Sequence, residues 1–125
     1  MKKMFLIMFF MAFVSVSAYS QSDDEVYIMV EKRAEFPGGQ SEMLKYIQDN
    51  RQYPDEAKEN DVHGKVLVRF IVERDGTLSD VKVMRGIGSG CDEEAVRVIT
   101  SMPKWKPGEQ GGKAVRTSLT LPVTF

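Results

Sequence analysis

The segment KVLVRFIVERDGTLSDVKVMR, residues 65–85, decides the fold predicted for this chain. Residues 65–73 alternate, with an apolar side chain at every even-numbered position, which predicts a strand that buries one face. Asp75-Gly76 follows, and both residues tolerate the positive φ that a tight hairpin turn requires. The return strand is predicted over residues 78–85. The segment therefore predicts an antiparallel β-hairpin.

Helical patterns lie on both sides of this hairpin. Residues 41–50 predict a helix, and its apolar stripe consists of Met43, Leu44 and Ile47. Residues 54–59 predict a short helix that begins with a proline, a residue suited to the first helical position. Residues 92–102 predict a longer helix that ends at a proline. The buried stripe of this helix consists of Ala95, Val98, Ile99 and Met102.

The C-terminal residues 115–125 alternate between apolar and polar side chains, which predicts another strand. Pro122 has no N–H to donate, so this strand lies at a sheet edge or is ending there. The apolar run 26–30 predicts a short extra strand, and we hypothesise that it pairs with a sheet edge, including the edge formed by the C-terminal strand. Residues 104–113 are expected to form a loop. The predicted fold is α+β, a two-layer sandwich with an antiparallel sheet of about three main strands and helices on one face.

The N-terminal residues are typical of a secretory signal peptide. Lys2 and Lys3 precede an apolar run over residues 4–16, and small residues follow it. We expect residues 1–20 to be removed on export to the periplasm, residues 21–35 to form an extension, and residues 36–125 to form the single domain. An uncleaved membrane anchor is the alternative for residues 1–20.

Composition excludes several classes of function. The net charge is −1, so no overall charge attracts the protein to nucleic acid or to an anionic membrane. Cys91 is the sole cysteine, so the chain forms no internal disulfide bond. His63 is the sole histidine and cannot by itself hold a zinc ion, which needs three or four ligands. We therefore expect no metal, no cofactor and no nucleic-acid partner.

The segment RGIGSGCDEEAV, residues 85–96, resembles a phosphate-binding loop without matching one. Its glycines follow neither the dinucleotide-binding spacing nor the Walker spacing. Asp92, Glu93 and Glu94 occupy the first helical turn, where a bound phosphate would need positive potential. The same carboxylates disfavour a thiolate at Cys91. We predict that Cys91 is a small, partly buried residue, that the loop is structural, and that the protein is not an enzyme.

Trp105 has two readings. It could form an exposed aromatic binding platform between two lysines, or it could anchor the loop after the long helix in the core. We favour the core anchor.

The order of these features resembles the C-terminal domain of TonB-family energy transducers, over residues 36–125. The matching positions are Tyr53-Pro54-x-x-Ala57, Gly64-x-Val66-x-Val68-x-Phe70-x-Val72, Asp75-Gly76, Val81-x-Val83, Asp92-x-x-Ala95 and Trp105-x-Pro107. The resemblance implies a periplasmic protein of a Gram-negative cell that binds the TonB box of outer-membrane receptors by adding a strand beside its C-terminal strand.

The resemblance also implies which residues receive the receptor peptide. These residues are Val115, Arg116, Thr117, Ser118, Leu119, Thr120 and Leu121. Full transducers couple an ExbB/ExbD motor to uptake through a retained anchor and a long proline-rich spacer. This chain has a signal-like segment and no such spacer, so a stand-alone binding module is the leading expectation and a short anchored transducer is the alternative. Edge strands also pair with each other, which leaves a homodimer open.

Overall fold

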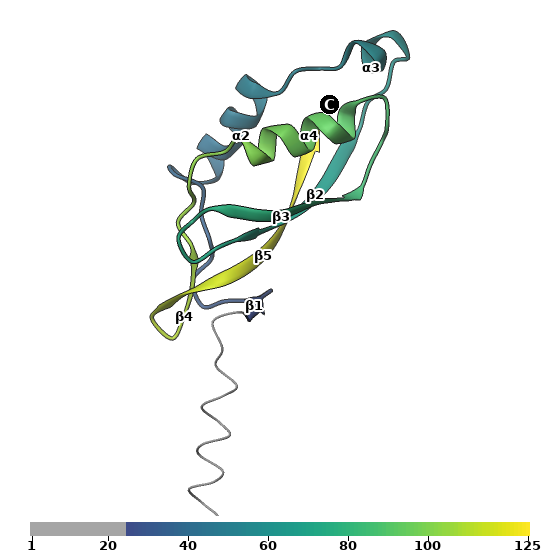
Figure 1. The fold of residues 1–125 in the computed structure, drawn as a ribbon. Helices are drawn as coiled ribbons and strands as arrows, with labels where there is room; N and C mark the ends of the chain where they lie inside the picture. Colours follow the sequence, from purple (N-terminus) through teal and green to yellow (C-terminus); the bar gives the residue numbers. More distant parts are fainter. Residues whose placement is uncertain (1–24) are drawn as a thin grey trace, which may run out of the picture.

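The computed structural model describes residues 25–125, so the predictions for the signal-like segment lie outside the described residues. Figure 1 shows a twisted sheet with helices above it. The elements in chain order are β1 (Val26–Tyr27), α2 (Gln40–Asn50), α3 (Asp55–Glu59), β2 (Lys65–Val72), β3 (Leu78–Arg85), α4 (Cys91–Thr100), β4 (Gly108–Gln110) and β5 (Lys113–Thr124). Within residues 25–125, no helix has the length and apolar character needed to span a membrane.

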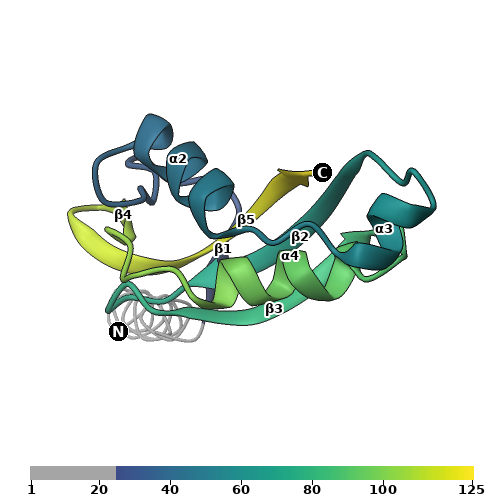
Figure 2. The same cartoon turned by 90° about the horizontal axis from the view of Figure 1, so that it is seen from above.

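The main sheet has the strand order β1-β5-β2-β3. Strand β2 is antiparallel to both β3 and β5, whereas β1 runs parallel to β5. Figure 2 shows that α2 and α4 lie on one side of the sheet, with α4 over β2 and β3 and α2 toward β5. The predicted two-layer α+β fold is confirmed, and so is the hairpin of β2 and β3.

Side chains alternate between the two faces of β2, and one of these faces forms the centre of the core. The four even-numbered residues of β2 are fully buried, namely Val66, Val68, Phe70 and Val72. The predicted helical stripe packs against them and is also buried, with Ala95, Val98 and Ile99 in α4 and Met102 just beyond its end. Trp105 completes the core, because its ring meets those of Phe36 and Phe70 edge-on at centroid distances of 5.8 and 5.5 Å. The prediction that Trp105 is a core anchor is confirmed.

The tip of the β2–β3 hairpin packs against the loop that follows α4. Gly76 has φ +88°, and its carbonyl oxygen accepts a hydrogen bond of 2.9 Å from the Trp105 N–H. A Cβ atom at Gly76 would lie 2.1 Å from the Trp105 carbonyl oxygen, too close for any side chain. Glycine is therefore required here by backbone conformation and by contact.

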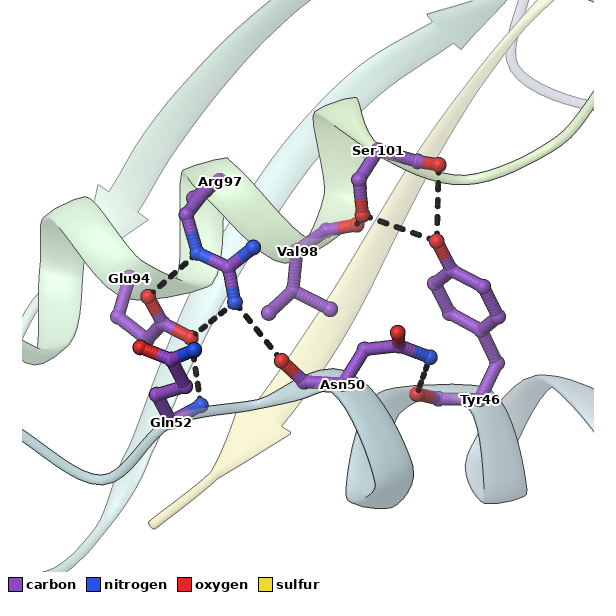
Figure 3. Close-up of polar contacts among 7 residues, drawn as sticks. All are labelled: Tyr46, Asn50, Gln52, Glu94, Arg97, Val98 and Ser101. Atoms are coloured by element: carbon purple, nitrogen blue, oxygen red, sulfur yellow. Dashed lines mark hydrogen bonds and ion pairs between the residues drawn. The ribbon is translucent and has the colours of Figure 1, made fainter.

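Polar side chains hold α2 against α4 (Figure 3). The Arg97 guanidinium donates to the carboxylate of Glu94 at 2.7 Å and to the carbonyl oxygen of Asn50 at 2.7 Å. Glu94 in turn accepts the Gln52 N–H at 2.6 Å, and its hydrogen bond from Arg97 lowers the pKa of the Glu94 carboxyl. The end of α2 is thereby tied to the middle of α4.

Three predictions about elements need correction. The expected loop over residues 104–113 contains β4, which pairs with the start of β5 across a turn at Gly111 and Gly112. The extra N-terminal strand covers only Val26–Tyr27. Leu44 is 49% exposed, because only one side of α2 faces the sheet. Residues 104–113 lack the alternating apolar pattern of a strand, so β4 is specified by its pairing partners.

Candidate functional site

The outer edge of β5, the side that faces away from β2, is the candidate binding site. Gly64 and Phe125 exchange two main-chain hydrogen bonds of 2.8 and 3.2 Å. The antiparallel register then runs without interruption from Lys65 opposite Thr124 to Val72 opposite Thr117. Backbone groups alternate in direction along a strand, so odd-numbered residues of β5 bond to β2 and even-numbered residues point outward.

Few partners occupy this outer edge. Strand β1 pairs with β5 only at Arg116 and Thr117, in parallel orientation. The Thr124 carbonyl oxygen accepts a hydrogen bond from Arg51. In this parallel register the outward Ser118 N–H bonds to the Tyr27 carbonyl group of β1. Beyond that point, no strand among residues 25–125 pairs with the Ser118 carbonyl group or with the outward backbone groups of Thr120. Pro122 also faces outward, where its missing N–H removes no bond to β2.

The hypothesis that the N-terminal strand pairs with a sheet edge agrees with the position of β1. The strand lies beside the start of the predicted receiving segment and leaves the remainder uncovered. Its neighbours Ile28 and Met29 are 81% and 86% exposed, so the chain bends away instead of continuing along β5. The structure thus leaves the outer edge of β5 open from the Ser118 carbonyl group to Pro122.

Side chains of the receiving segment fall on two faces. Thr117, Leu119 and Leu121 point toward the helices, and Thr117 is 1% exposed. Arg116 lies on the opposite face, where its guanidinium donates to Glu73 at 2.8 Å. This hydrogen bond is the main cause of a lowered pKa of the Glu73 carboxyl. The ion pair ties the end of β2 to the start of the open edge.

A groove, which we call the edge groove, lies between β5 and the chain leading into α2. It has a volume of about 310 Å³, and its apolar lining consists mainly of Phe36, Met43, Trp105, Leu119 and Leu121. Sequence alternation placed Leu119 and Leu121 on one face of the strand. It could not reveal the groove, because the opposite wall comes from residues 33–43, far away in the chain.

The glycine loop before α4 behaves as a structural joint. Asp92 accepts the Ile87 N–H at 2.8 Å and the Gly88 N–H at 3.1 Å, so the chain supplies its own anion to this loop. Cys91 is fully buried, and burial followed by the charge of Asp92 raises the pKa of its thiol. These positions agree with the predicted structural roles of Cys91 and the loop.

The remaining polar candidates lie at the far end of the domain. His63 contacts the Tyr53 hydroxyl through Nδ1 at 2.8 Å and Asp61 through Nε2 at 2.7 Å. Within residues 25–125, no group of three His, Cys, Asp or Glu side chains is arranged to hold a metal ion. His63 therefore lies in a small polar cluster beside the start of β2.

The family-motif positions mostly stabilise turns and strand ends. Tyr53 donates to the Val62 carbonyl oxygen and packs edge-on against Phe125, at a centroid distance of 6.0 Å. Asp75 accepts the Thr77 N–H at 3.0 Å and thereby closes the hairpin turn. Pro54 precedes α3 as its N-cap, and Ala57 within α3 is fully buried. Pro107 is half-buried, and the structure gives no specific reason for a proline there.

Comparisons with known proteins agree with this architecture. The family model described as "Gram-negative bacterial TonB protein C-terminal" matches residues 49–125. A solution NMR structure of the Helicobacter pylori TonB C-terminal domain, residues 194–285, is similar with a TM-score of 0.51 and 23% identity, covering 68% of this chain and 89% of that one.

A second structure of the Helicobacter pylori domain, residues 179–285, has a TM-score of 0.50 and 23% identity, covering 71% of this chain and 84% of that one. No curated protein matches the chain. At this identity the solved structures show a shared fold, while the family match spans more than half of the sequence. The resemblance found in the sequence is confirmed, and the chain belongs to the TonB C-terminal domain family.

Proposed function

We propose that this protein binds peptides of outer-membrane receptors by adding their extended chain as a strand to the outer edge of β5. The observation that carries the proposal is the unpaired stretch between β1 and Thr124, where the Ser118 carbonyl group and both backbone groups of Thr120 point outward. Unpaired edge groups are a template for another strand. Main-chain hydrogen bonds then supply affinity, and alternate side chains supply selectivity.

Membership of the family supports this choice of partner. The TonB C-terminal domain family is linked to TonB-dependent transport, and its members interact with outer-membrane receptors without catalysing a reaction. In this chain the sole thiol is buried and has a raised pKa, which is unfavourable for a nucleophile. A non-enzymatic peptide-binding module is consistent with both observations.

We further propose that the mature protein is periplasmic and begins near Gln21. The basic start at Lys2 and Lys3, followed by an apolar run, supports export through a signal peptide. The alternative is a short transducer that keeps this segment as an inner-membrane anchor and engages an ExbB/ExbD-type motor. Sequencing the N-terminus of protein isolated from cells distinguishes the cleaved periplasmic protein from the anchored transducer. A start near Gln21 excludes the anchor, and a retained Lys2 excludes cleavage.

Binding of receptor peptides to edge variants tests strand addition. Synthetic N-terminal peptides of outer-membrane receptors from the same cells are titrated against the wild type, Thr120→Pro and Thr120→Val. Thr120→Pro removes the outward N–H that no strand pairs with, so we expect affinity to fall about tenfold. Thr120→Val keeps the N–H and should bind like the wild type. Equal affinity of a correctly folded Thr120→Pro variant contradicts strand addition at β5.

A further inference from the structure

The edge groove lies where an added strand would direct its side chains. Along a strand, side chains alternate between faces, and neighbours on one face of adjacent strands lie about 4.5–5.5 Å apart. Peptide residues opposite Leu119 and Leu121 would therefore project toward the helices, beside the two leucines that line the groove. The groove and the open edge are continuous with each other.

The chemistry of the groove selects an apolar side chain. Its opposite wall contributes Phe36, which precedes α2, and Met43, which lies in α2, and Trp105 also lines it. Leu119 and Leu121 are only half-buried, so apolar surface remains for a ligand to cover. The exposed residues Arg33 and Glu35 stand at the rim with opposite charges and give no net preference.

The charge of the protein surface indicates which residue of the bound peptide fits between its two apolar residues. That peptide residue would face the uncovered side of the sheet, next to Thr120, whose neighbour on β2 is Arg69. Arg69 and Lys65 make no ion pair among the described residues, whereas Glu73 is already engaged by Arg116. Two strand spacings amount to roughly 10 Å, a gap that arginine and glutamate side chains can span together. An acidic residue fits this position.

We infer that the edge groove is a selectivity site that reads peptides with two leucine-sized side chains at alternate positions and an acidic residue between them. The inference rests on the strand addition proposed above and deepens it by naming the peptide class. The leucine-sized side chains enter the edge groove. The acidic side chain lies on the uncovered face of the sheet, toward Arg69.

Four blocked peptides test the inference on the full chain. The first is acetyl-Thr-Thr-Leu-Glu-Leu-Thr-Thr-amide. The others replace both leucines by alanine, replace the glutamate by lysine, or place the leucines side by side. Affinity is measured from backbone amide shifts, and the emission of Trp105, the sole tryptophan, reports occupancy of the groove.

We expect the first peptide to bind about tenfold tighter than its alanine or adjacent-leucine versions, since each buried methylene contributes. The lysine version should bind about threefold more weakly, with a difference that shrinks in high salt. Only leucine peptides in the alternating pattern should change Trp105 emission. Leucine and alanine peptides that bind equally well would overturn the groove inference while leaving strand addition intact.

Two leucine-to-threonine substitutions, one in the edge groove and one on the opposite face of the sheet, test whether the groove causes the preference for leucine peptides. Leu121→Thr alters the groove, whereas Leu67→Thr alters a half-buried leucine on the uncovered face, opposite Pro122. We expect Leu121→Thr to abolish the preference for leucine peptides and Leu67→Thr to retain it. A preference that persists in Leu121→Thr overturns the location. Should Leu121→Thr unfold, Leu119→Thr takes its place. Failure of every peptide, receptor peptides included, overturns both proposals.

Discussion

Glu73 and Arg116 join β2 to β5 just where the open edge begins. Their side chains are about one quarter exposed, with a distance of 2.8 Å between Arg116 Nε and a Glu73 carboxylate oxygen. Glu73 also accepts a hydrogen bond from the Ser79 hydroxyl of β3, so one carboxylate connects three strands. A single residue therefore aligns the receiving strand with the rest of the sheet.

The Glu73 carboxylate should make stability depend on pH. Its pKa is lowered in the folded protein, chiefly by the Arg116 hydrogen bond. Its contribution to the free energy of unfolding is therefore complete above the unfolded pKa of roughly 4.3 and is lost as the pH falls through the lower folded value. Denaturant unfolding between neutral and acidic pH should show a smaller decline in Glu73→Gln. Identical pH profiles for both proteins would contradict this role.

Gly76 should be the least replaceable glycine among those with positive φ. We expect Gly76→Ala to lower the free energy of unfolding by more than about 2 kcal/mol, because strain and collision with the Trp105 carbonyl oxygen add together. The matched control is Gly111→Ala, with φ +59° and no atom within 4 Å of the added carbon. Backbone strain alone should lower the free energy of unfolding of Gly111→Ala by about 1 kcal/mol. Equal losses of unfolding free energy in the two variants, measured by thermal or chemical unfolding, would contradict the role assigned to the contact with Trp105.

Residue roles set by near neighbours in the sequence could be predicted. The carboxylates after Gly90 indicated that the glycine loop holds no phosphate, and Asp92 bonds to that loop. Roles that depend on distant partners could not be predicted. Glu73 and Arg116 are 43 positions apart, and nothing in the pattern of either strand specifies that they meet.

At the scale of elements, β1 is a partial cover for the receiving strand. Its pairing extends over two residues of β5, and Val26 is 37% exposed, so little surface holds it in place. A longer peptide strand can gain Arg116 as a pairing partner only when β1 leaves. The short cover thus limits the length of edge that a ligand can use.

Removal of β1 should extend the binding edge without disturbing the sheet. In a chain that starts at Glu31, amide exchange should become faster at Arg116 and Ser118 only. The odd-numbered amides of β5 should keep their protection, because they bond to β2. Ile28→Ser in the full chain is the control, since Ile28 is 81% exposed and pairs with no strand. Loss of protection throughout β5 would show that β1 supports the whole strand.

Pro122 should set where a bound strand stops. Pro122→Ala adds an outward N–H, so receptor peptides should bind about threefold to tenfold tighter, the contribution of one hydrogen bond. Thr120→Pro should weaken binding by a similar factor, because it removes a donor from the same edge. Titration of both variants with one peptide checks the pair. Unchanged affinity in both would place the peptide elsewhere.

Elements with strong periodicity could be predicted, and weakly patterned ones could not. The alternation in β2 and β5 and the stripe of α4 gave bounds within a few residues of those observed. Strand β4 has the sequence Gly-Glu-Gln, with no β-branched or aromatic residue. It forms because the turn at Gly111 and Gly112 folds it onto β5 and because Lys32 bridges to its other side at Glu109.

At the scale of the whole molecule, the helices leave one sheet edge accessible. Helix α4 covers β2 and β3, while α2 lies toward β5 and forms one wall of the edge groove (Figure 2). The sequence indicated two layers and an edge strand near the C-terminus. It could not indicate the groove, which exists only once residues 33–43 fold beside β5.

The central claim is that the outer edge of β5 receives a peptide strand. The most direct measurement is amide hydrogen exchange, residue by residue, in the full chain with and without a receptor N-terminal peptide. Strand addition predicts that exchange slows most at Thr120, whose N–H points outward without a strand partner, while odd-numbered amides of β5 change little. Saturating peptide that leaves Thr120 unchanged and protects another surface would contradict the claim.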